Sequence, residues 1–118
     1  MQKERSFEEL VADITSLMDQ YVTFRALIMI KRHECFLASL TNLTTNDPPH
    51  LRVEVFSPGL ESILNEKAGC LVGSLYTICD EVRVDGLLQK GTLDEFVGSL
   101  SNIKSMTLYQ DNKVITII

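Results

Sequence analysis

The sequence predicts an α+β fold in a single domain, residues 1–118, because helical and strand periodicities alternate along a chain of ordinary domain size. Ser6 and Glu9 form a capping box, and the apolar residues behind it recur at the three- and four-residue steps of an amphipathic helix. Residues 51–56 alternate between apolar and polar side chains, which is typical of a half-exposed strand. We therefore expect about three helices against a mostly antiparallel sheet, in the order α-ββ-β-α-ββ-α-ββ.

The first half of the chain predicts a helix, a hairpin and a third strand. The helix is expected to run from Ser6 to near Tyr21, where β-branched residues begin. Residues 23–30 are apolar on both faces, which indicates a central strand, and a polar break separates them from a second strand at residues 35–40. A polar loop with two prolines then leads to the strand at residues 51–56, whose inward side chains should be Leu51, Val53 and Val55.

The second half begins with a short helix that is expected after Ser57 and Pro58. Its buried stripe should consist of Leu60, Ile63 and Leu64. Residues 70–88 fit either a helix or two strands. Two strands are favoured because Val, Ile, Thr and Tyr dominate the segment, and because Gly73 weakens a helix.

A second capping box, Thr92 with Glu95, predicts a third helix that ends near Asn102. The chain should then close with a hairpin of residues 105–109 and 113–118, which turns at residues 110–112.

Charge and composition limit the classes of partner. The formal net charge is −5 and the sequence pI is about 4.9, whereas nucleic-acid binders usually carry a basic surface that neutralises phosphates. No stretch approaches the ~20 apolar residues that span a bilayer, and the N-terminus has no secretory pattern. Three cysteines without a CxxC spacing suggest free thiols. We expect a cytoplasmic protein that binds neither nucleic acid nor membrane.

No catalytic, cofactor or metal motif emerges. The six glycines form neither a P-loop nor a GxGxxG pattern, and the two histidines, His33 and His50, lie in predicted turns. A metal set drawn from His33, Cys35, Cys70 and Cys79 would lack an ordinary zinc spacing. The acidic group of Asp80, Glu81 and Asp85 could bind a cation, although a solvated turn between two strands explains it better. We expect no catalytic residue, metal or cofactor.

The C-terminus is the most unusual feature of the sequence, because the last five residues are Val-Ile-Thr-Ile-Ile and no charge follows Lys113. Chain termini usually fray and are polar. A strand here would place Val114 and Ile118 on one face and Ile115 and Ile117 on the other. Such a strand is either inserted within the sheet or buried by another chain. Val114, Ile115, Ile117 and Ile118 are therefore the candidate interface residues.

Two functional hypotheses follow from these observations. The first is a non-enzymatic protein-binding module, an adaptor, assembly subunit or chaperone-like protein that works as a dimer or within a larger homo- or hetero-oligomer. The expected order of elements, the small size and the low pI are similar to those of class I type III secretion chaperones, apart from the closing hairpin. The second is a small-ligand sensor, or an enzyme with a site shared between protomers, and a pocket around Tyr76, Cys79 and Tyr109 is the candidate for it.

Overall fold

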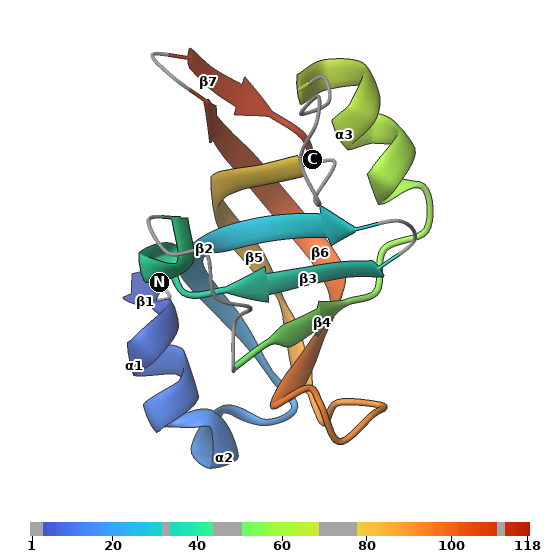
Figure 1. Cartoon of the computed structure of the whole chain (residues 1–118). Helices are drawn as coiled ribbons and strands as arrows, with labels where there is room; N and C mark the ends of the chain where they lie inside the picture. Colours follow the sequence, from blue (N-terminus) through green and yellow to red (C-terminus); the bar gives the residue numbers. More distant parts are fainter. Residues whose placement is uncertain (1–3, 32–33, 44–50, 69–77, 111–112) are drawn as a thin grey trace.

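The protein is a small α+β structure in which the sheet closes on itself (Figure 1). The computed structural model describes residues 4–31, 34–43, 51–68, 78–110 and 113–118. Its strands are β1 (Glu4–Ser6), β2 (Gln20–Lys31), β3 (Glu34–Ala38), β4 (Val53–Val55), β5 (Ile78–Gln89), β6 (Gly98–Gln110) and β7 (Lys113–Thr116). Its helices are α1 (Phe7–Ala12), α2 (Ile14–Leu17) and α3 (Leu60–Ala68), with a 3-10 turn η1 (Leu40–Leu43).

The five strands β2, β3, β4, β6 and β5 form a closed barrel in that order, because β5 pairs with β6 on one side and with β2 on the other. The pairs within the barrel are antiparallel except β4 with β6, which run parallel. Two short strands extend the sheet outside this ring. β1 pairs with β2 in parallel, and β7 pairs with β6 in an antiparallel hairpin. The prediction of a mostly antiparallel sheet is therefore confirmed.

The main hydrophobic core fills the barrel. Alternate residues of β2, namely Phe24, Ala26 and Ile28, point into it and are fully buried. Leu10 of α1 and Leu64 of α3 pack against the same core, so both helices are held by their apolar faces. The other face of β2 and β3 carries a second, smaller cluster that consists of Leu27, Met29, Phe36 and Ala38. Both faces of β2 are therefore covered, as its sequence predicts.

An irregularity in the β5–β6 ladder bends the two longest strands around the barrel. Asp85 lies opposite Ser105 and Leu87 lies opposite Ser101, so β6 accommodates extra residues at this point. Asn102 adopts a left-handed φ of 47° there. Gly86 faces the bulge, and a Cβ at this position would lie 3.0 Å from the Leu100 Cγ atom and from the Ser101 carbonyl oxygen. The close approach of the two backbones explains why glycine occupies this position.

The N-terminal helix begins as predicted and ends earlier. The Ser6 side chain accepts a hydrogen bond from the Glu9 amide, and the Glu9 carboxylate accepts one from the Ser6 amide, both at 3.1 Å. The helical path is interrupted at Asp13, so the segment forms α1 and α2 rather than one helix that reaches Tyr21. Tyr21 belongs to β2, because Asp19 turns the chain with a φ of 63° and its amide donates to the Leu88 carbonyl oxygen at 2.7 Å.

The prediction of a helix from Thr92 to about Asn102 is wrong. Residues 90–97 form a loop and β6 begins at Gly98. Leu93, Phe96, Val97 and Leu100 recur at helical steps in the sequence, but Leu93, Phe96 and Val97 lie in the loop, and Leu100 belongs to β6 and is buried in the barrel core. Pairing of β6 with both β4 and β5 overrides the local helical preference. The element order on which the similarity to secretion chaperones rested is therefore not the observed one.

The segment at residues 70–88 contains one long strand in its described part. β5 runs without interruption from Ile78 to Gln89, so the predicted turn at Asp80 and Glu81 is wrong. Each residue from Ile78 to Leu88 has a partner on β2, which keeps this stretch extended. Residues 69–77 lie outside the described residues. The hairpins β2–β3 and β6–β7 were both predicted from the sequence and are confirmed.

Among the helices of the described residues, none has the length and apolar character that a bilayer crossing requires.

We predict that Ser6→Ala lowers the free energy of unfolding by about 1 kcal/mol, because it leaves the Glu9 amide at the start of α1 without its acceptor. Glu9→Gln is the control, since glutamine can still accept from the Ser6 amide and should cost less. Chemical denaturation followed by circular dichroism measures both changes. Equal midpoints for Ser6→Ala and the wild-type chain would show that the box does not stabilise the helix.

Candidate partner-binding groove

A shallow groove lies on the outer surface of the barrel, where the start of β3, the end of β4 and loop 90–97 meet. In Figure 1 this loop is the orange segment between β5 and β6. The groove has a volume of about 240 Å³. Its lining residues are Glu34, Cys35, Glu54, Val55, Phe56, Leu93, Glu95 and Phe96. We call it the β4 groove.

The parallel pairing of β4 with β6 brings the elements of the β4 groove together. The Val97 amide donates to the Arg52 carbonyl oxygen at 2.9 Å, and the Phe56 amide donates to the Leu100 carbonyl oxygen at 2.8 Å. The first of these bonds ties the C-terminal end of loop 90–97 to the residue before β4, and the second joins the residue after β4 to β6. The Thr92 hydroxyl lies 2.8 Å from each carboxylate oxygen of Glu54 and donates to them, which ties the other end of the loop to the same strand.

The apolar part of the β4 groove is largely open to solvent. The Phe56 side chain is 52% exposed and the Leu93 side chain is 56% exposed. Phe96 is half-buried because it packs against the outer cluster on β2 and β3. Two large apolar side chains are thus held in water on one small surface. Such an exposed pair is a feature of interaction sites when polar residues surround it.

Among the described side chains, three carboxylates and no basic group line the β4 groove. Glu34 and Glu95 are exposed and Glu54 is half-buried. The Arg52 guanidinium lies 3.8 Å from Glu95 and stacks between two rings, 5.3 Å from the Phe36 centroid and 5.8 Å from the Phe96 centroid. Arg52 therefore stiffens the wall of the groove and offsets one carboxylate, and the described lining remains acidic.

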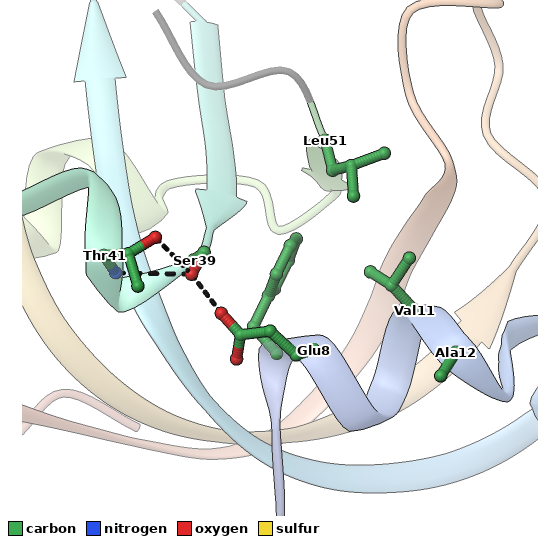
Figure 2. Close-up of a pocket in the computed structure, with 7 residues that line it drawn as sticks. Glu8, Val11, Ala12, Ser39, Thr41 and Leu51 are labelled. Carbon is green, nitrogen blue, oxygen red and sulfur yellow. Dashed lines mark hydrogen bonds between the residues drawn. The ribbon is translucent and has the colours of Figure 1, made fainter. Parts of the chain in front are cut away.

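A second cavity, of about 460 Å³, lies beside α1 (Figure 2). It is lined by Phe7, Glu8, Val11, Ala12, Ser39, Thr41 and Leu51. The Ser39 hydroxyl donates to the Glu8 carboxylate and lies 2.9 Å from the Thr41 hydroxyl, so polar groups lie at one end and apolar side chains at the other. We call it the α1 cavity.

A network of ion pairs covers the outer face of β1, β2 and β5. One oxygen of Glu4 accepts from Arg25 at 3.1 Å and from Arg83 at 2.9 Å. Arg25 also contacts Glu81 at 3.0 Å and lies 4.6 Å from the centroid of the Tyr109 ring. The hydrogen bond to Glu4 is the main reason why the pKa of Arg25 is raised. These exposed pairs join the three neighbouring strands β1, β2 and β5.

The C-terminal strand alternates as its sequence predicts. The Val114 side chain is 68% exposed, whereas Ile117 is 5% exposed and joins the barrel core. Ile115 is half-buried against the same core, and Ile118 is exposed. Among the described strands β7 pairs with β6. The inward residues are thus buried within this chain, and the outward residues Val114 and Ile118 stay available as interface candidates.

The residues considered for chemistry do not converge in the described part of the chain. His33, His50, Cys70 and Tyr76 lie outside it, and Cys35 is half-buried at the edge of the β4 groove. The acidic residues Asp80, Glu81 and Asp85 lie along β5, and the Glu81 carboxylate is bound by Arg25. Within the described residues, no group of three His, Cys, Asp or Glu side chains could hold a metal ion.

The strand order and the parallel β4–β6 contact are those of the OB fold, a five-stranded Greek-key barrel. Counted along the barrel, β3 and β4 are its second and third strands, and loop 90–97 connects its fourth and fifth. OB barrels bind oligonucleotides and oligosaccharides on the face and with the loops that correspond to these elements. The β4 groove occupies that position. No model of a protein family matches the sequence, and a search of curated proteins finds no significant match.

The sequence did not identify the β4 groove. Leu93 and Phe96 stand at helical spacing behind the Thr92–Glu95 capping box, which is typical of the buried face of a helix that does not form, and Glu54 falls at an outward position of its predicted strand. The residues of the groove come from three separate parts of the sequence, around residues 34, 54 and 95, and no motif joins them.

We predict that Thr92→Asp destabilises the protein by about 1–2 kcal/mol, because it replaces the hydroxyl that donates to Glu54 with a second carboxylate. The double variant Thr92→Asp/Glu54→Gln should recover most of this loss. At a helix N-cap, aspartate is as good as threonine. An unchanged urea midpoint in Thr92→Asp would therefore contradict the loop structure of residues 90–97 and favour the predicted helix that begins at Thr92.

We predict that Ile117→Ala lowers the free energy of unfolding by about 2–5 kcal/mol, since Ile117 packs in the barrel core. Val114→Ala, three residues away on the exposed side, should change it by less than about 0.5 kcal/mol when both variants are measured at a protein concentration low enough to keep the chain monomeric. Guanidinium denaturation of both variants tests the alternation. Equal losses of unfolding free energy in the two variants would contradict the burial of Ile117 and the exposure of Val114.

Proposed function

We propose that this protein is a non-enzymatic protein-binding module, an adaptor or assembly subunit that binds another protein chain through the β4 groove. The observation that carries the proposal is the pair of exposed side chains, Phe56 and Leu93, in a groove lined by carboxylates. Fully burying one side chain of this size stabilises a complex by about 1.5–3 kcal/mol. Two neighbouring anchors can therefore act as the centre of an interface.

The charge of the β4 groove supports a protein partner over a nucleic acid. A fold does not determine a function, so the OB topology alone does not predict oligonucleotide binding. Sites for single-stranded nucleic acid combine a positively charged groove with stacking aromatic rings. The β4 groove offers Phe56 for stacking, but its Glu34, Glu54 and Glu95 would repel phosphates.

The outward residues of the C-terminal strand supply a second contact surface in this proposal. Val114 of β7 and Ile118, two residues beyond its end, are exposed, and a partner chain that covers them would remove apolar surface from water. They are separate from the β4 groove lining. We therefore assign them to the assembly of a dimer or a larger oligomer.

The α1 cavity supports a second candidate function, the binding of a small ligand. Its volume of about 460 Å³ lies within the roughly 300–1,000 Å³ range of small-molecule sites. Glu8 and Ser39 could orient a polar group of a ligand whose apolar part contacts Val11 and Leu51.

We predict that the double variant Phe56→Ser/Leu93→Ser lowers the affinity for a direct protein partner at least tenfold, which corresponds to about 1.4 kcal/mol of binding free energy. The experiment captures proteins from the native cell with the wild-type chain, purifies each candidate, and measures its dissociation constant by calorimetry. Leu51→Ser is the matched control, because Leu51 is an exposed apolar residue outside the β4 groove.

Two outcomes would contradict the proposed function. In the first, no purified candidate binds the wild-type chain directly, while a small-molecule thermal-shift screen yields a ligand that Leu51→Ser weakens. That result would favour the α1 cavity. In the second, a partner binds the chain and neither Phe56→Ser nor Leu93→Ser changes its affinity, which would place the interface elsewhere.

A further inference from the structure

We propose that the occupant of the β4 groove is an extended peptide segment of the partner protein that carries both Lys or Arg side chains and apolar ones. This inference rests on the proposed function and adds the chemistry of the partner. It depends on three features of the groove: its charge, its mixture of apolar and acidic side chains, and its size.

The charge of the β4 groove selects a cationic partner. Glu34 projects from β3 and Glu95 from loop 90–97, and both are exposed on its rim. The third carboxylate, that of Glu54, is already bound by the Thr92 hydroxyl and lies deeper. Among the described side chains, the cation paired with a groove carboxylate is Arg52, and it offsets only Glu95. A Lys or Arg side chain would therefore gain charge-assisted hydrogen bonds at the rim, whereas a phosphate or an acidic side chain would be repelled.

The mixture of side chains in the lining favours a segment that carries both basic and apolar residues. The exposed apolar side chains Phe56 and Leu93 line the same groove as Glu34 and Glu95. In an extended peptide every second side chain points to the same side, so an apolar residue and a basic residue two positions away can face the groove together. A segment that is only basic would leave the apolar pair exposed, and one that is only apolar would bury the carboxylates without partners.

The size of the β4 groove favours a peptide over a compact ligand. Its volume of about 240 Å³ is below the range of sites that enclose small molecules. A groove of this size accommodates one or two anchoring side chains and leaves the rest of the occupant outside. Affinity then depends on how many residues of a longer chain make contact, which is how an extended segment binds.

The test measures binding of fluorescein-labelled twelve-residue peptides to the full chain by fluorescence anisotropy. The peptides alternate pairs of Lys with pairs of Leu, pairs of Glu with pairs of Leu, or pairs of Lys with pairs of Ser, and a single-stranded oligothymidine of matched length is the fourth probe. We expect the Lys-Leu peptide to bind at least tenfold more tightly than the other three. Raising the salt from 50 mM to 500 mM should weaken its binding several-fold, because the rim charges are screened.

Charge variants locate the effect. The double variant Glu34→Gln/Glu95→Gln should lower the affinity for the Lys-Leu peptide at least fivefold. The double variant Glu34→Lys/Glu95→Lys should shift the binding preference toward the Glu-Leu peptide. Asp13→Asn/Glu66→Gln removes the same amount of charge from exposed positions outside the β4 groove and should have no effect. Thermal melts of all variants confirm that each is folded.

Two results would overturn this inference. Equal affinity for the Lys-Leu and Glu-Leu peptides would remove the charge selectivity, and tighter binding of oligothymidine would make the groove a nucleic-acid site. These results are distinguishable from failure of the proposed function. A native partner that loses affinity with Phe56→Ser/Leu93→Ser but not with Glu34→Gln/Glu95→Gln would leave the protein-binding function intact and exclude a basic segment.

Discussion

The pairing of β2 with β5 is the interaction on which the rest of the structure depends. It extends from Gln20 opposite Leu88 to Ile30 opposite Ile78 and closes the barrel. The two strands are far apart in the sequence, so their pairing carries a loop-closure cost that the burial of both apolar faces of β2 offsets. Because the barrel is closed, none of its five strands is left as an unpaired edge. The outer surface of the barrel is then the surface on which a partner can bind.

The β4 groove is a consequence of this closure. β6 completes the ring by pairing with both β5 and the short strand β4, so the connection between β5 and β6 lies against β4. The Thr92 hydroxyl holds this connection in place by donating to the Glu54 carboxylate, and the same arrangement positions the exposed anchors Phe56 and Leu93. The binding surface thus rests on rigid strands, although its apolar residues come from a strand end and a loop.

The sequence predicts local features of this fold and misses those that depend on distant pairing. The capping box at Ser6, the hairpin β2–β3 and the alternation of β7 each follow from neighbouring residues, and the structure confirms them. Residues 92–102 carry a capping box and apolar residues at helical steps, and the pairing of β6 with β4 and β5 overrides this local preference. The β4 groove was unpredictable for the same reason, because it joins residues 34, 54 and 95, which become neighbours only when the barrel closes.

The most direct test of this account is the backbone structure of residues 92–102 in solution. Nuclear magnetic resonance can measure amide exchange and cross-strand proton contacts for this segment. The barrel predicts slow exchange of the Phe56 and Val97 amides, which donate to Leu100 and Arg52, together with contacts between Val53 and Gly98 across the parallel pair. Sequential helical contacts through residues 92–102, with rapid exchange at Phe56, would contradict the closed barrel and remove the groove that depends on it.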